Sequence, residues 1–343
     1  IVSLLKNQEL LHRVKHAQIL AFFMNHCAYL LLREKYKLYP SIVIGHGLGH
    51  YNALVSSESI TYENAIKIVK RRAELAEQIV EQSDGIGMLS ISGEDIDINE
   101  ISKLCDELSD EIRYVTISII NTQQDIVLSY YNYQVEEIID YFADYHVSVI
   151  KDLVPYHSKA MLGVIPEFID EINDIEFKDP IYPVISNVTG KPLNKTQIRN
   201  DLIQQLIGPI NMYKCVQYPE KMGISILIEA SFSRVLPKIV SRNHIMKAYN
   251  IIQDSDKFIH VVREKENEYT VCLEMLGQLL SIPDIDKYMD AEELRLFYDE
   301  LKMHPDSSDK EYKGDPMLYK KYQSIMATKN EYINFNNQMI KII

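Results

Sequence analysis

The sequence predicts an α/β protein whose main body has three layers, with a mostly parallel β-sheet between helices. Short apolar runs that suit buried strands alternate with longer amphipathic segments that suit helices, as in parallel sheets covered on both faces. The pattern changes between residues 85 and 153, and beyond residue 240 it reads as helical and strongly charged. We therefore expect a body from residues 1–84 and 154–240, an inserted domain at 85–153 and a helical C-terminal extension at 241–343.

The elements of the body follow from the positions of apolar residues. Residues 8–37 carry a broad apolar face, which predicts one long helix. Pro40 ends that helix, and the run Ile42 to Ile44 has the composition of a strand buried on both faces. The remaining elements expected of the body are helices at about 49–56 and 62–82, a helix ending near 172, a strand at 182–186, a helix at 197–207 and a strand at 224–229.

The inserted segment has its own order of elements. Its pattern predicts strand, helix, strand, strand, helix and strand, which is the ferredoxin-like split arrangement. The strands are expected at 88–92, 114–120, 125–131 and 147–153, and the helices at 99–109 and 135–145.

Composition excludes several classes of protein. The formal charge of −13 leaves no basic stripe for nucleic acid, and no apolar run reaches the 18 residues of a membrane span. No signal peptide is recognisable. The four cysteines show no metal-binding spacing, so we expect reduced thiols in a cytoplasmic protein without a metal site; they are Cys27, Cys105, Cys215 and Cys272.

The segment from Ser41 to Leu54 holds the strongest functional signal. Its glycines at 45, 47 and 49 follow a short strand and precede a helix. A dinucleotide-binding loop would need a glycine where His50 stands, and the Lys-Ser/Thr pair of a phosphate loop is absent. The pattern G-x-S-x-G, the nucleophile elbow of a hydrolase-like body, fits except that Gly47 occupies the nucleophile position. This stretch alone leaves a plain strand-to-helix turn as the alternative.

Glycine at position 47 should preserve such a turn, because it enters a strained backbone conformation without the steric cost of a Cβ. It removes the hydroxyl, however, and no other serine is placed to replace it. Ser41 lies below the tip of the turn and Ser158 reads as a loop hydroxyl. His50, one helical turn away, is a conceivable acyl acceptor, but a structural or pocket role fits it better.

Five ordered segments together resemble the malonyl-CoA:acyl-carrier-protein acyltransferase family. The family's elbow reads Gly-His-Ser-Leu-Gly-Glu-Tyr, against Gly-His-Gly-Leu-Gly-His-Tyr here. The resemblance covers roughly residues 8–240, and the charged C-terminal part makes the chain most similar to the free-standing (trans-acting) acyltransferases of polyketide synthases. The matching segments are 45–51, 65–72, Val-Pro-Tyr-His at 154–157, Ser-Asn-Val-Thr-Gly at 186–190 and Gln-Leu-Ile-Gly-Pro-Ile at 205–210.

The resemblance implies a role for each matched residue. In the family a serine attacks an acyl-CoA thioester with a histidine as general base, and the acyl group then passes to a phosphopantetheine thiol. His157 takes the place of the base, which must then lie within about 10 Å of Gly47. The other implied site residues are Leu48 as backbone oxyanion donor, Arg72 as ligand of the malonyl carboxylate, and His46, His50 and Asn187 as substrate-binding residues. On its helix, Arg72 has a second interpretation as part of a solvated basic face with Lys67, Lys70 and Arg71.

Four departures from the family bear on activity. Gly47 removes the nucleophile, and His50 replaces an acidic residue. The family's Gly-Pro-Gly is Ser-Phe-Ser at 231–233. Its N-terminal Gly-Gln-Gly segment, the source of another oxyanion contact, has no counterpart in this sequence.

We therefore interpret the chain as an acyltransferase-family protein of polyketide or fatty-acid biosynthesis that has lost serine-based transfer. As such a pseudoenzyme it would act by binding an acyl carrier protein, an acyl-CoA or a polyketide synthase module. Malonyl-CoA and acyl-phosphopantetheine are the implied ligands, with no permanently bound cofactor. The alternative is an active acyltransferase or a thioester hydrolase in which His157 works without an acyl-enzyme. An engineered Ser-to-Gly change at position 47 is a third alternative.

Overall fold

The computed structural model describes residues 13–36, 38–83, 85–94, 96–150, 154–224, 226–243, 246–257 and 339–342. Two compact units divide the chain: residues 1–253 with 340–343, and residues 254–339. Almost all of the second unit lies outside the described residues, as do the predicted start of the first helix and most of the predicted helical extension. The fold below is that of the first unit.

The first sheet has five strands in the order β6-β1-β10-β8-β9. The pairs whose register is described, β1 with β6, β1 with β10 and β8 with β9, are all parallel. These strands are Val43–Ile44 (β1), Val184–Ile185 (β6), Ile226–Glu229 (β8), Lys247–Asn250 (β9) and Met339–Ile342 (β10). The sequence prediction of a mostly parallel sheet agrees with these pairs.

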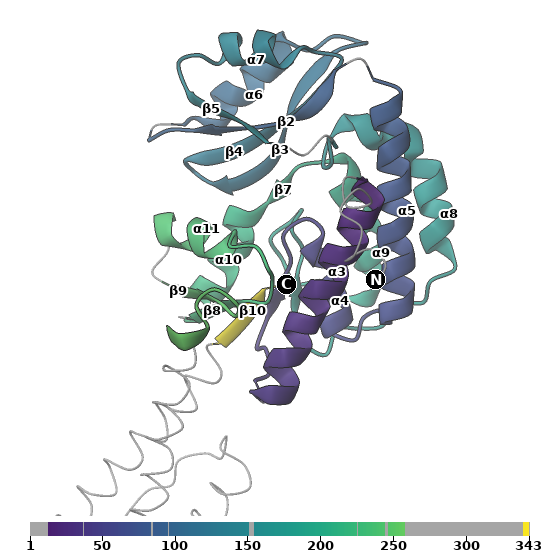
Figure 1. Cartoon of the computed structure of the whole chain (residues 1–343), viewed down its shortest axis with the longest axis vertical. Helices are drawn as coiled ribbons and strands as arrows, with labels where there is room; N and C mark the ends of the chain where they lie inside the picture. The colour runs from purple at the N-terminus through teal and green to yellow at the C-terminus, as the bar shows by residue number, and fades with distance from the viewer. Residues whose placement is uncertain are drawn as a thin grey trace, which may run out of the picture. The chain divides into compact units, whose positions relative to one another are not determined.

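Helices cover both faces of this sheet (Figure 1). Val43 packs into one hydrophobic cluster, with residues of α3, α4, α5, α8 and α9, while Ile42 and Ile44 pack into a second one, with residues of α10 and α11. The unbroken apolar run at 42–44 is explained by this two-sided burial. The helices are Val14–Leu30 (α3), Gly49–Ser56 (α4), Tyr62–Glu81 (α5), Ile165–Asn173 (α8), Lys195–Ile207 (α9), Met212–Lys221 (α10) and Leu236–Asn243 (α11).

Helices α3 and α5 pack side by side (Figure 1). A π-helical turn, Leu31–Lys35, continues α3, so the long N-terminal helix of the prediction is present from residue 14. Thr61 caps α5, because its side chain accepts a hydrogen bond from the Asn64 N–H at 3.2 Å. The cap marks the start of α5, and the buried face of this helix includes Arg72.

The second sheet has the order β5-β2-β4-β3-β7. Its first four strands pair antiparallel, and the order of elements from β2 to β5 is strand, helix, strand, strand, helix and strand, as the sequence predicts. Strand β7 joins it in parallel to β3. The division of the first unit into a body and an insertion stays a prediction. These elements are Ile86–Ser92 (β2), Ile98–Glu107 (α6), Tyr114–Thr122 (β3), Asp125–Tyr131 (β4), Val135–Tyr141 (α7), His146–Ile150 (β5) and Ile210–Asn211 (β7).

The prediction of a helical chain from residue 241 is wrong at two places. Residues 247–250 form β9, and residues 339–342 form β10. The free edge of β8 supplies backbone partners for β9, and the buried Asn250 side chain donates to a carboxylate oxygen of Glu229 at 2.9 Å. This tertiary pairing overrides the local helical pattern. None of the described helices combines the length and apolarity needed to cross a bilayer.

Candidate active site

The turn between β1 and α4 is the segment predicted to be a nucleophile elbow, and we call it the elbow below. Gly47 at its tip has a φ of +54°, in the left-handed region that favours glycine. Gly45 is required for a different reason, because a Cβ there would lie 2.2 Å from backbone atoms of His50. Position 47 differs from position 45 in having room for a side chain, since a Cβ built on Gly47 has one neighbour within 4 Å.

That single neighbour is His157. Its Nε2 atom lies 3.5 Å from the position of a Cβ on Gly47, well inside the separation of about 10 Å expected of the family's base. His157 is itself left-handed, with a φ of +61°, and its N–H donates to the Leu206 carbonyl at 3.1 Å. A histidine 110 positions away in the sequence is therefore held directly against Gly47, the predicted nucleophile position.

Gln205 joins the two parts of this arrangement. Its side-chain amide donates to the Gly47 carbonyl at 3.0 Å, and its own carbonyl accepts from Nδ1 of His157. Because a carbonyl can only accept, the His157 proton resides on Nδ1 and the Nε2 lone pair faces Gly47. Sequence reasoning did not select Gln205 as a site residue, although it begins one of the five family-like segments.

The surroundings of His157 keep its ring neutral. Burial, with further contributions from the Arg72 guanidinium, His46 and His50, lowers the pKa of His157 to about 3. A neutral ring with a free Nε2 lone pair can accept a proton from a hydroxyl, thiol or water at position 47.

This depressed pKa predicts a loss of stability in acid. Between about pH 6.5 and pH 3 the unfolded chain binds a proton on His157 that the folded chain does not, so stability falls as pH falls, by at most about 1.4 kcal/mol per pH unit. His157→Gln should remove this contribution and flatten the dependence of the unfolding midpoint on pH in urea titrations. His16→Gln, on the part-exposed side of α3, is the control. Parallel slopes in the unmodified and His157→Gln proteins would contradict the prediction.

Arg72 lies next to this site and is buried, with 1% of its surface exposed. Its Nη1 donates to Oε1 of Gln18 at 2.7 Å, and its Cζ lies 3.6 Å from the centre of the Tyr156 ring. No carboxylate among the described residues forms an ion pair with it. The interpretation as a solvated basic face fits Lys67 and Lys70, which are exposed, and does not fit Arg72.

His46 precedes the tip of the elbow and is half-buried. Its Nε2 lies 3.1 Å from Oδ1 of Asn121, and burial is the main cause that lowers its pKa. The next residue after Gly47, Leu48, carries a backbone N–H with no acceptor among the described residues. An N–H in that state at the start of a helix can donate to a developing oxyanion.

His50 and Asn187 are both fully buried behind the elbow. Nε2 of His50 lies 2.9 Å from Oδ2 of Asp201, at an angle outside that of a hydrogen bond. The Asn187 amide donates to the Gly45 carbonyl at 3.3 Å. These contacts give both residues a part in holding the elbow, and their role in substrate binding stays a prediction.

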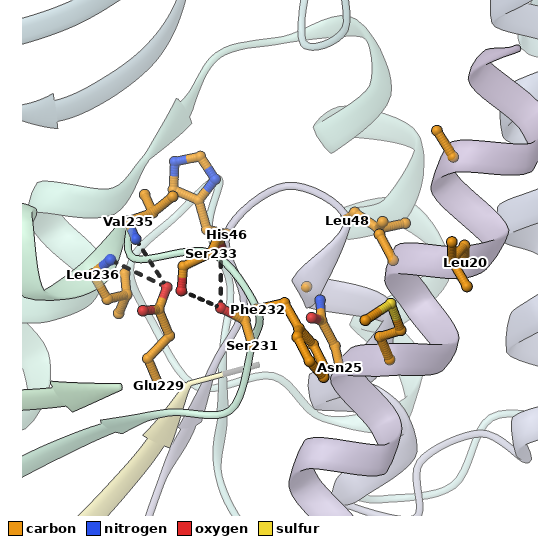
Figure 2. A pocket seen from close by; sticks show the side chains of 14 residues that line it. Leu20, Asn25, His46, Leu48, Glu229, Ser231, Phe232, Ser233, Val235 and Leu236 are labelled. Carbon is orange, nitrogen blue, oxygen red and sulfur yellow. Dashed lines mark hydrogen bonds between the residues drawn. The ribbon is translucent and has the colours of Figure 1, made fainter. Parts of the chain in front are cut away.

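A cavity of about 470 Å³ adjoins the elbow, and His157 is not among its lining residues (Figure 2). Its walls are one face of α3, the elbow residues on both sides of Gly47, and the loop that joins β8 to α11. Sequence reasoning registered that loop, residues 231–233, as a departure from the family and not as a wall of a cavity. Among the described residues, no cluster of histidine, cysteine and carboxylate side chains could hold a metal ion.

Residues 1–243 match the family described as "Acyl transferase domain". The chain belongs to this acyl transferase family. Among curated relatives, the malonyl-CoA–acyl carrier protein transacylase of Staphylococcus aureus is 26% identical over 224 residues, which are 64% of this chain and 71% of the relative. The Bacillus subtilis protein of the same name is 28% identical over 269 residues, 77% of this chain and 66% of the relative.

Solved structures of transacylases share the fold of this acyl transferase. A type II polyketide synthase malonyl-transacylase, solved with its acyl carrier protein, superposes with a TM-score of 0.68 at 25% identity, covering 75% of this chain and 84% of the other. The transacylase of Acinetobacter baumannii gives a TM-score of 0.68 at 23% identity, with 74% and 82% covered. The prediction of an acyltransferase-family protein similar to malonyl-CoA:acyl-carrier-protein transacylases is confirmed.

Proposed function

We propose that this acyl transferase binds acyl thioesters of coenzyme A or of an acyl carrier protein at the elbow without forming a serine acyl-enzyme. One observation carries the proposal: a Cβ built on Gly47, the residue that we assign to the nucleophile position, would lie 3.5 Å from Nε2 of His157. The names of the relatives support the choice of thioester and carrier as ligands. A biosynthetic partner of fatty-acid or polyketide type is part of the same proposal.

Other groups around the empty position suit a bound thioester. The Leu48 N–H can donate to the thioester carbonyl oxygen, and the Arg72 guanidinium, which has no carboxylate partner among the described residues, can hold an acyl carboxylate such as that of malonate. Neither of these interactions needs the serine hydroxyl. The loss of one triad member typically costs about 10⁴- to 10⁶-fold in turnover while binding survives, so a binding protein is the function that this set of residues serves best.

A second candidate function is direct transfer or hydrolysis, which the room beside Gly47 favours. A pantetheine thiol or a water in that room could give its proton to Nε2 of His157 while its sulfur or oxygen attacks the thioester carbon. The tetrahedral oxyanion would accept a hydrogen bond from the Leu48 N–H. Its collapse would break the carbon–sulfur bond, and the leaving thiolate would take the proton from His157.

Intact-protein mass spectrometry after incubation with malonyl-CoA tests the proposal. The unmodified protein should gain no malonyl group, because no hydroxyl stands at position 47 to hold the ester. Calorimetric titration should at the same time show that malonyl-CoA binds. Release of free coenzyme A from the same mixture, lost in His157→Ala, would instead establish the second candidate. A stable mass gain in the unmodified protein would contradict both.

A further inference from the structure

The cavity beside the elbow is lined mainly by apolar side chains, and some of them are small. Leu20 and Met24 on α3 and Leu48 of the elbow contribute apolar side chains to its lining, and Figure 2 labels Leu20 and Leu48. Two further lining residues of α3, Ala17 and Ala21, leave width because their side chains are single methyl groups. A cavity with such walls favours an aliphatic ligand, because binding removes the apolar surface of both the ligand and the cavity from water.

The described lining of the cavity has no cationic side chain to bind a carboxylate. No lysine or arginine is among the described residues that line it. Its one carboxylate, Glu229, is turned to the protein: one oxygen accepts from the N–H groups of Val235 and Leu236, at 3.1 and 3.3 Å, and the other from Asn250. Arg72, the buried cation of the elbow site, is not among the lining residues. A carboxylate-bearing acyl group such as malonyl therefore gains nothing by entering this cavity.

The cavity also adjoins the elbow. His46, Leu48 and Gly49, which flank Gly47 in the sequence, all line it. A thioester whose carbonyl oxygen accepts from the Leu48 N–H can therefore extend its acyl group along the α3 wall. The volume of about 470 Å³ falls within the roughly 300–1,000 Å³ of small-molecule sites.

From these three observations we infer that the cavity takes the unbranched, uncharged aliphatic chain of an acyl thioester, an inference that rests on the proposed binding of thioesters at the elbow. The cavity thereby determines which acyl groups bind. The space along α3 limits the length of the acyl chain, whereas Arg72 binds a carboxylate at a separate place. Each methylene buried in the cavity should tighten binding about four-fold, which corresponds to about 0.8 kcal/mol.

Calorimetric titration with acetyl-, butyryl-, hexanoyl- and octanoyl-CoA tests the inference on the full chain. The dissociation constant should fall about four-fold per added methylene until the cavity is full. Ala21→Leu narrows the cavity at an exposed helical position and should flatten this series, with the largest loss of affinity for octanoyl-CoA. Cys27→Leu, exposed on the same helix but outside the cavity, is the matched control and should retain the series.

The outcomes separate this inference from the proposed function. Equal dissociation constants for all four thioesters and for coenzyme A itself would mean that the pantetheine arm, not the acyl chain, occupies the cavity, and would overturn the inference while thioester binding stands. A series unaffected by Ala21→Leu would also overturn it. Failure of every thioester to bind would overturn the proposed function and the inference together. Octanoate binding as tightly as octanoyl-CoA would assign the cavity to free fatty acids and contradict the thioester.

Discussion

Gly47→Ser should convert the protein into one that takes up a single malonyl group from malonyl-CoA. The serine Cβ would lie 3.5 Å from Nε2 of His157, which places the hydroxyl beside a neutral ring with a free lone pair. The adjacent Leu48 N–H has no acceptor in the described part of the chain and can stabilise the oxyanion. Because the loss of one triad member costs about 10⁴- to 10⁶-fold in turnover, restoring the hydroxyl should produce a labelled species in intact-protein mass spectra where the unmodified protein shows none.

Two variants control for this result. Gly47→Ala introduces the same backbone strain, of about 1–3 kcal/mol in a left-handed turn, but supplies no hydroxyl and should stay unlabelled. Adding His157→Ala to Gly47→Ser should abolish or greatly slow labelling, since the base is then missing. A folded Gly47→Ser protein that takes up no label would mean that the rest of the site no longer supports transfer. A purely binding role would then remain.

Arg72→Ala should weaken the binding of malonyl-CoA by about 2–5 kcal/mol, as for truncation of one partner of a buried charge pair. The guanidinium is buried and has no carboxylate partner among the described residues, so a ligand carboxylate is the counter-charge that it lacks. Acetyl-CoA, which has no carboxylate, should lose much less affinity. Calorimetric titration of the two thioesters against both proteins measures the difference.

Arg72→Lys and Lys70→Ala refine the assignment. The lysine variant should recover only part of the affinity, because an ammonium cannot form the paired hydrogen bonds of a guanidinium with a carboxylate. Lys70, exposed on the same helix, should be replaceable by alanine without effect. Equal losses for malonyl-CoA and acetyl-CoA in Arg72→Ala would show that the substitution disturbs packing against Tyr156 rather than carboxylate binding.

The sequence predicted those parts of the fold in which local pattern and tertiary burial agree. The run at 42–44 reads as a two-sided strand because its side chains do pack on both faces, and the element order from β2 to β5 follows from alternation within each strand. The pattern failed at 247–250. There a strand forms because the edge of β8 offers it partners, and no local periodicity encodes a partner 21 positions away.

The candidate site shows the same division. The sequence predicted Gly47 and His157 as site residues because each lies in a short motif whose residue types indicate a catalytic role. The Gln205 side chain donates to the Gly47 carbonyl, and its backbone carbonyl accepts from His157. A backbone carbonyl is present in every residue, so the residue type at 205 does not indicate the second contact. The cavity beside the elbow went unseen because its walls come from three distant segments, which only the folded chain brings together.

Two left-handed residues meet at the elbow, Gly47 with a φ of +54° and His157 with a φ of +61°. An active member of the family with serine at the first position would carry a non-glycine residue at both, whereas this chain carries one at His157 alone. Glycine at position 47 therefore relaxes the tip of the turn, because it adopts a positive φ without the steric cost of a Cβ. In a protein that acts by binding, as proposed above, selection for a more stable fold would retain this glycine and would work against a return to serine.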